Sequence, residues 1–249
     1  PAAGRSPTIR GHRREVTEAT PESGIACPIP VRSVLKFRCD ICSKQLDRTH
    51  AAEDEQEAGG GIDWDALPAS VVAWVRVPGT TVDYPIVQGR PESPDFYLTH
   101  DVGGGRSAWG APYIDAGCAR GTESPLVIVY GHHMFDGTMF APLAQYSSRD
   151  FAEGHRTIRV FTREKEIGLE IFAVDVVDAS SEGKQTNFAD AAELGTYLGD
   201  KLSRCEVVLE EPKDIAQAWA FVTCSYQTSN SRTVVYAKEV EAWDSRPSE

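Results

Sequence analysis

The chain has 249 residues, and its 37 acidic side chains outnumber its 25 Lys and Arg residues, which gives a formal net charge of -12 at pH 7. This excess of acid argues against a nucleic-acid-binding protein, which would present a basic face. With 41% hydrophobic residues the chain can bury a substantial core, either as one domain with a tail or as two domains.

Residues 1–61 differ in composition from the rest of the chain. They mix Pro, Gly, Arg, Glu and Thr without sustained periodicity and end in three consecutive glycines. We therefore expect a mostly disordered or aberrant segment that closes with a linker. Neither a signal-peptide pattern nor an apolar run of about 18 residues occurs in the 249 residues, so no membrane anchor is predicted.

One possible metal site lies in this first segment. Cys27, Cys39, Cys42 and His50 could form a Cys3His zinc site, because the spacing of Cys39 and Cys42 is typical of a zinc knuckle. A single C-x-x-C pair in a segment with almost no core is weak evidence, so a segment without metal is the favoured interpretation. A non-enzymatic metal-binding module is kept as an alternative.

From residue 62 onward short β-strands dominate the pattern. Pro78-Gly79 predicts a tight turn between the first two strands, and residues 163–165 predict a hairpin connection. Eight strands in one compact region favour a closed barrel or a sandwich, which we place at 62–243, followed by a short tail at 244–249. The predicted strands are 71–77, 82–88, 109–115, 126–130, 157–162, 166–177, 218–224 and 233–240.

Helices are few, and the clearest spans 189–204. Apolar residues at 191, 194, 198 and 202 lie on one face of this segment, which predicts an amphipathic helix packed against the strands. Shorter helical segments are predicted at 139–146, 148–153 and 65–72.

Cys118 and Cys205 lie within the β-rich region. They could form a disulfide outside the cytoplasm, but only if their Cα atoms come within about 7 Å, and two buried free thiols are the favoured interpretation. No motif in this region demands a metal or an organic cofactor, and none is predicted.

Three residues at the ends of strand-like segments indicate a nucleophilic thiol enzyme. Cys224 ends one strand, Arg232 follows eight residues later, and His132 comes directly after the apolar run 126–130. A thiolate can attack a carbonyl, an imidazole can move protons, and a guanidinium can donate hydrogen bonds to the oxyanion. A lone cysteine after such a run is more often a small buried hydrophobe, so the surrounding sequence decides.

Four stretches surround and connect these residues. Residues 127–134 read VIVYGHHM and lead to DGTMF at 136–140, while Thr223 and Cys224 precede Arg232. Residues 74–88 and 96–115 form the other two stretches. In this order they resemble the class B sortases, and the resemblance covers about residues 62–242.

The resemblance implies a fold and an activity. It implies an eight-stranded barrel, with the helix at 189–204 in the long connection between the sixth and seventh strands, beside a substrate groove. It implies a cysteine transpeptidase that cleaves a sorting signal of the Asn-Pro-x-Thr-x kind after Thr. The acyl group would pass to an amine of a peptidoglycan precursor or to a pilin lysine. The expected location is the extracytoplasmic face of the membrane, with which full-length members of the family are associated.

The resemblance also assigns roles to single residues. Cys224 would be the nucleophile, Arg232 the oxyanion donor, and His132 the general acid and base, because the family's histidine directly follows Tyr-Gly. His133 stands where Asn is common in the family. Leu98, Thr186, Phe188 and Thr223 are implied to line the substrate groove.

A hydrolytic cysteine peptidase is the nearest alternative activity. In such an enzyme water, rather than an amine, would accept the acyl group. A papain-like enzyme is disfavoured, because the candidate histidine precedes the cysteine in the chain and no matching cysteine motif lies near the start.

Overall fold

The computed structural model describes residues 61–180, 183–224 and 230–240. The predictions for the N-terminal segment, with its candidate zinc ligands Cys27, Cys39, Cys42 and His50, and for the tail at 244–249 lie outside the described residues. Within those three ranges, no helix has both the length and the apolar character that a bilayer crossing requires.

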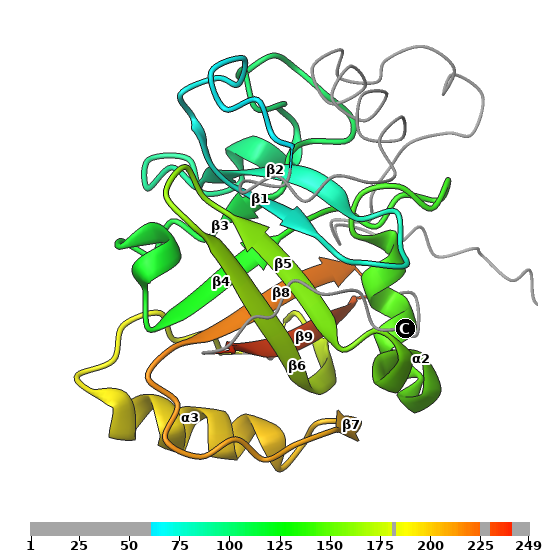
Figure 1. The fold of residues 1–249 in the computed structure, drawn as a ribbon, viewed down its shortest axis with the longest axis vertical. Helices are drawn as coiled ribbons and strands as arrows, with labels where there is room; N and C mark the ends of the chain where they lie inside the picture. Colours follow the sequence, from blue (N-terminus) through cyan, green and yellow to red (C-terminus); the bar gives the residue numbers. More distant parts are fainter. Residues whose placement is uncertain (1–60, 181–182, 225–229, 241–249) are drawn as a thin grey trace, which may run out of the picture. The chain divides into compact units, whose positions relative to one another are not determined.

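Nine strands of the described chain form one sheet, in the order β5-β1-β2-β3-β4-β8-β9-β6-β7. Because β5 also pairs with β6, the first eight strands of this order close into a ring, and β7 is added to the edge of β6 (Figure 1). The predicted closed eight-stranded barrel is therefore confirmed. The strands are β1 Val71–Arg76, β2 Asp83–Gln88, β3 Tyr113–Ile114, β4 Leu126–Tyr130, β5 Thr157–Phe161, β6 Glu166–Asp178, β7 Val207–Val208, β8 Ala218–Cys224 and β9 Ser231–Glu239.

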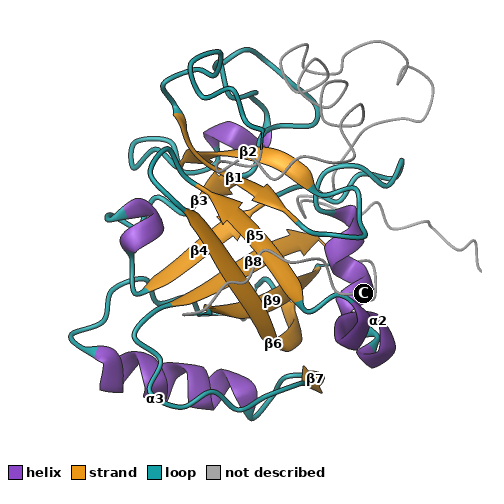
Figure 2. Cartoon of the chain, in the orientation of Figure 1, coloured by secondary structure: helices purple, strands orange, loops and turns teal. Residues whose placement is uncertain are grey.

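The helices are short and peripheral (Figure 2). The longest, α3, covers part of the barrel wall because Leu194 and Leu198 are buried on one face, and Asp190 caps its start by accepting a hydrogen bond from the Glu193 N–H at 2.9 Å. The predicted amphipathic helix is thus confirmed, with slightly narrower bounds. The helices are α2 Arg149–Gly154, α3 Ala191–Leu202 and the 3₁₀ segments η1 Phe96–Leu98, η2 Gly121–Glu123 and η3 Ala141–Ser147.

Three local predictions differ from the structure. The helix predicted at 65–72 is wrong: residues 61–70 form turns and Val71 already begins β1. The strand predicted at 109–115 shrinks to the two residues of β3. Gly110 has a φ of +60, where a Cβ would lie 2.3 Å from the Tyr97 carbonyl oxygen, so the chain bends sharply before β3 begins. The strand β7 was not predicted, because two residues carry no alternating pattern.

A large aromatic core holds β8 in the barrel wall. Trp219 and Phe221 are buried with ring centroids 5.9 Å apart, and Phe140 packs against Phe221 at 6.4 Å. Burial of each such side chain stabilises the fold by about 2–3 kcal/mol. The strand that ends in Cys224 is therefore anchored by some of the largest buried side chains.

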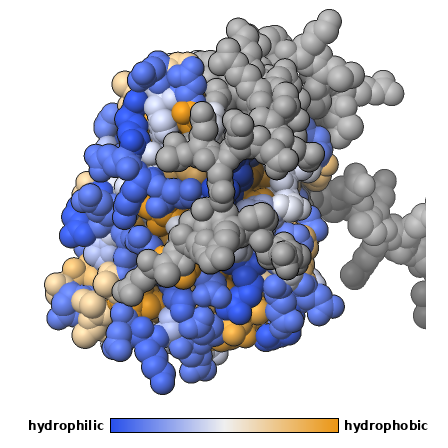
Figure 3. Space-filling model, in the orientation of Figure 1, coloured by the Kyte–Doolittle hydropathy of each residue, from blue (hydrophilic) through white to orange (hydrophobic). Residues whose placement is uncertain are grey.

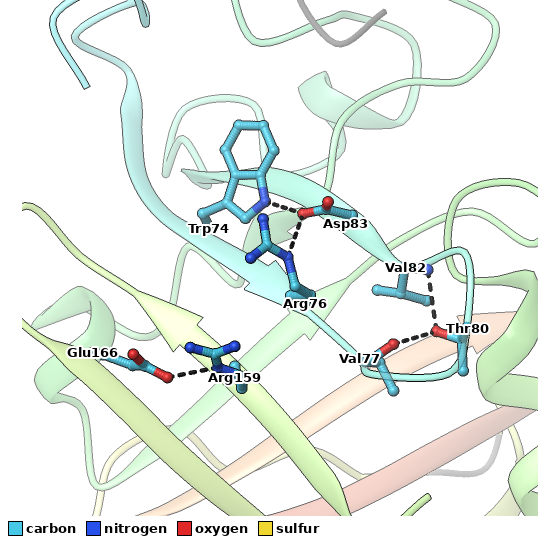
Figure 4. Close-up of polar contacts among 8 residues, drawn as sticks. All are labelled: Trp74, Arg76, Val77, Thr80, Val82, Asp83, Arg159 and Glu166. Atoms are coloured by element: carbon cyan, nitrogen blue, oxygen red, sulfur yellow. Dashed lines mark hydrogen bonds and ion pairs between the residues drawn. The ribbon is translucent and has the colours of Figure 1, made fainter. Parts of the chain in front are cut away.

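Side-chain polar contacts also join neighbouring strands of the barrel (Figure 4). The Trp74 indole donates to Asp83 at 2.5 Å, Arg76 pairs with the same carboxylate at 3.2 Å, and Arg159 pairs with Glu166 at 2.6 Å. These contacts join β1 to β2 and β5 to β6. Much of the surface visible in Figure 3 is hydrophilic, as expected for a chain with a net charge of -12.

The turn predicted at Pro78-Gly79 is present between β1 and β2. Gly79 has a φ of +76, which an L side chain rarely adopts. The Thr80 hydroxyl donates to the Val77 carbonyl at 2.8 Å and accepts from the Val82 N–H at 3.1 Å (Figure 4).

Candidate active site

Cys224 and Arg232 lie directly opposite each other on neighbouring antiparallel strands. Cys224 is the last residue of β8, and its register partner on β9 is Arg232. Side chains of such opposed residues project from the same face of the sheet, with Cβ atoms about 4.5–5.5 Å apart. Both residues are half-buried, and the Arg232 guanidinium donates to the Ser231 carbonyl at 3.0 Å. The register therefore brings a thiol and a guanidinium to one place.

His132 reaches the same end of the barrel from β4. This strand runs parallel to β8 with Tyr130 beside Val222, and the Gly131 N–H extends the ladder by donating to the Val222 carbonyl at 3.0 Å. The strand pairing ends at Tyr130 and Val222, and His132 and Cys224 each follow two residues beyond that pair. Gly131 is required here, because a Cβ would lie 2.5 Å from the ring of Phe140.

The ring of His132 is held by the main chain of η1. Its Nε2 lies 2.7 Å from the Leu98 carbonyl oxygen. A carbonyl oxygen only accepts, so Nε2 carries the hydrogen in this contact. Leu98, implied by the resemblance to line a groove, is half-buried and contributes its carbonyl to this contact. A main-chain contact of this kind has no signal in the sequence.

His133 also contacts the candidate nucleophile, a role that the sequence did not predict. Its Nδ1 donates to the Cys224 carbonyl oxygen at 2.8 Å, and a bridge between His133 and Met139 closes the loop that carries it. The backbone at the end of β8 is thereby tied to the segment that follows β4. The only signal in the sequence is the pair of adjacent histidines at a strand end.

We expect His133→Ala to lower the kcat of peptide cleavage about fivefold with little change in KM, because one hydrogen bond of about 1 kcal/mol positions the nucleophile. Asparagine can offer an N–H at nearly the same place, so His133→Asn should keep most of the rate. The measurement is steady-state kinetics of both variants, with His155→Ala as the control. His155 directly follows α2, and its Nδ1 contacts the Phe151 carbonyl within that helix. Equal losses in the Asn and Ala variants would contradict this role.

Two aromatic side chains, from β3 and β4, pack against each other. The rings of Tyr113 and Tyr130 lie 5.4 Å apart. Burial raises the pKa of Tyr113 well above its usual range, and the nearby charges of Asp95, Asp115 and Cys224 add to the shift. The Tyr113 phenol therefore stays neutral beside the thiol.

A cavity of about 320 Å³ lies on the face of the sheet that carries Arg232. Its wall includes Ile128 and Tyr130 of β4, Val222 of β8, Val234 of β9 and Tyr197 of α3. These strand positions alternate along β4, β8 and β9 and share the face of Cys224, since successive side chains of a strand point to opposite faces. The cavity therefore has a largely apolar wall on the same face of the sheet as Cys224, and Arg232 is one of its lining residues.

The other residues implied to line a groove occupy different places. Thr223 is 1% exposed, and its side chain lies on the face opposite to that of Cys224. Thr186 lies against Gly117, where an added Cβ would come within 2.8 Å of the threonine hydroxyl. Phe188 is half-buried and packs on Tyr197 with ring centroids 5.4 Å apart. Thr186 and Phe188 therefore belong to the segment that leads into α3, beside the cavity.

The remaining described cysteines are free, as predicted. Cys118 is buried and Cys205 half-buried, and burial raises the pKa of the two thiols to about 11 and about 12. Both are therefore poor nucleophiles at neutral pH. Within the described ranges, no group of three or more His, Cys, Asp or Glu side chains is arranged to hold a metal ion.

Comparison with known proteins identifies the family. The family model for the sortase domain matches residues 75–240. Sortase B of Listeria monocytogenes is 30% identical over 136 residues, which are 55% of this chain and 54%, about half, of the Listeria protein. Sortase B of Staphylococcus aureus is 25% identical over 181 residues, 71% of this chain and 73% of that protein.

Solved structures agree with the sequence comparisons. Clostridium perfringens sortase B superimposes with a TM-score of 0.61 at 29% identity, covering 69% of this chain and 94% of that one. A Staphylococcus aureus sortase B-substrate complex has the same fold, with a TM-score of 0.65 at 21% identity over 80% of this chain and 93% of that one. The chain therefore belongs to the sortase family, and the relatives and solved structures that it resembles are sortase B proteins.

Proposed function

We propose that this protein is a cysteine transpeptidase that cleaves a cell-wall sorting signal after a threonine and transfers the acyl group to an amine. One observation carries the proposal: Cys224 and Arg232 are register partners on β8 and β9, while His132 follows the end of β4, which pairs with β8. In the proposed mechanism these residues act as nucleophile, oxyanion donor and proton-transfer group.

In the proposed acylation step, the Cys224 thiolate, whose proton has passed to His132, attacks the threonine carbonyl carbon. The carbonyl π electrons move to oxygen, and Arg232 donates hydrogen bonds to the oxyanion that forms. When the intermediate collapses, the C–N bond breaks and His132 gives a proton to the departing amine. A thioester on Cys224 remains.

In the proposed second step, an amine attacks the thioester carbonyl. His132, now deprotonated, takes a proton from the incoming nitrogen, and the thiolate of Cys224 leaves as the new amide bond forms. The enzyme returns to its starting state without a cofactor, because the amide bond that is formed replaces the one that was broken.

The finer assignments follow the family. The signal would be of the Asn-Pro-x-Thr-x kind, the acceptor an amine of a peptidoglycan precursor or a pilin lysine, and the place of action the extracytoplasmic face of the membrane. The cavity beside Arg232, with its apolar wall and α3 along one side, supports a peptide as the substrate.

The test is product analysis by mass spectrometry. The full chain is incubated with an Asn-Pro-Gln-Thr-Asn peptide, with and without triglycine. Cleavage after Thr with a glycine-extended product is expected. A free acid as the only product, even with excess triglycine, would instead show a hydrolytic peptidase.

A further inference from the structure

The cavity beside the proposed nucleophile carries two cationic side chains. Lys184 and Arg232 are both among its lining residues, and the part of the lining that the structure describes contains no Asp or Glu. This is unusual for a chain whose acidic residues exceed its basic ones by 12. The remaining wall is largely aliphatic and aromatic.

Lys184 is fixed in place across the mouth of the cavity. Its Nζ pairs with the Asp115 carboxylate at 2.5 Å, and that carboxylate is 6% exposed, whereas the lysine side chain is 55% exposed. The Gly117 N–H also donates to Asp115, at 2.7 Å, and the Tyr130 hydroxyl contacts the same side chain. Asp115 is therefore enclosed by donors, and the ammonium of Lys184 lies between it and solvent.

A second contact supports this position. Thr186, two residues after Lys184, lies against Gly117, so the connection between β6 and α3 is held to the turn after β3 at two neighbouring points. The ammonium has three N–H donors, and Asp115 occupies one of them. The contact with Asp115 restrains the ammonium, which lowers the cost of ordering this side chain when a ligand binds.

The charge of the lining discriminates between the two substrates of a transpeptidase. Lys184 and Arg232 repel a protonated amine, so the acceptor is not expected to bind here, whereas they attract a carboxylate. Ile128, Val222 and Val234 offer apolar surface to the aliphatic part of a side chain. An acidic residue, with a short apolar stem and an anionic tip, has the complementary chemistry.

We propose that the cavity binds an acidic side chain of the sorting signal, on the acyl side of the cleaved bond, and that Lys184 selects it. This inference rests on the proposed transpeptidase function and names the chemical class of its preferred signal. The recognition is a charge-assisted hydrogen bond from a lysine whose position Asp115 maintains.

The experiment compares matched peptides with the full chain. In an Asn-Pro-Gln-Thr-Asn peptide, each of the three positions before Thr is replaced in turn by Glu, Gln or Lys, and kcat/KM for cleavage is measured. At one position we expect kcat/KM for the Glu peptide to exceed that for the Gln peptide about tenfold, and that for the Lys peptide by a larger factor. A charge-assisted hydrogen bond to a half-exposed cation supports roughly this ratio. Lys184→Met should bring the Glu-to-Gln ratio close to one, and Lys184→Arg should retain it.

Lys165→Met is the matched control. It removes an ammonium that pairs with Glu239 and is not part of the cavity lining, so the preference for Glu should persist. Loss of the preference in Lys165→Met and Lys184→Met alike would overturn direct recognition by Lys184, and so would equal rates for Glu and Gln at all three positions in the unchanged chain. If no peptide gives a Cys224-dependent product, the proposed function itself fails, a result distinct from turnover without charge preference.

Discussion

Replacement of Cys224 by alanine is expected to abolish thioester formation and to lower peptide cleavage by at least about a thousandfold. No neighbouring group can replace a thiolate that forms the covalent intermediate, and removal of a nucleophile from such a constellation leaves only what binding and oxyanion stabilisation provide. The measurement is the mass of the protein after incubation with peptide, together with the rate of product release.

Cys205→Ala supplies the control for that experiment. It makes the same substitution at a half-buried thiol, but the Cys205 sulfur contacts the Lys201 carbonyl at the end of α3, and burial raises its pKa to about 12. Its activity should match that of the unchanged chain. A thioester that persists in Cys224→Ala and maps to another cysteine would contradict the assignment of the nucleophile.

The barrel could be predicted because its strands alternate or run apolar over several residues. Seven of the nine strands are at least five residues long, and patterns of that length can be recognised in isolation. The failures have local causes. Gly110 bends the chain where a strand was expected, and β7 is too short to show a period. The turns at 61–70 contain Pro68, which also interrupts the helix predicted there.

The side chains of the candidate site could be predicted from the sequence, whereas its main-chain contacts could not. Cys224, His132 and Arg232 were found from residue type and surrounding sequence. Two hydrogen bonds could not be predicted: one joins the His132 ring to the Leu98 carbonyl, and the other joins the His133 ring to the Cys224 carbonyl. Both depend on tertiary distances that residue types do not encode. The position of Thr223 is different: strand alternation alone places its side chain on the face opposite to Cys224, so that signal was available in the sequence.

His132→Ala is expected to lower kcat for an amide substrate by about 10²- to 10⁴-fold, because it removes the group that protonates the departing amine. In the proposed mechanism the proton would travel through Nδ1, because Nε2 contacts the Leu98 carbonyl. His155→Ala, which removes an imidazole from the end of α2, should leave kcat unchanged. The measurement is single-turnover formation of the thioester on Cys224.

The leaving group provides the sharper test of this role. An activated ester of the same acyl peptide departs as a stable anion and needs no proton, so acylation of His132→Ala by the ester should recover to within about tenfold of the unchanged chain, since the lost general-acid term no longer applies. If the ester reacts as slowly as the amide, His132 would act on the thiol itself, by keeping it ionised, rather than on the departing amine. Transfer of the acyl group to triglycine should remain slow in the variant even with the ester, because the imidazole that would take a proton from the incoming amine is absent.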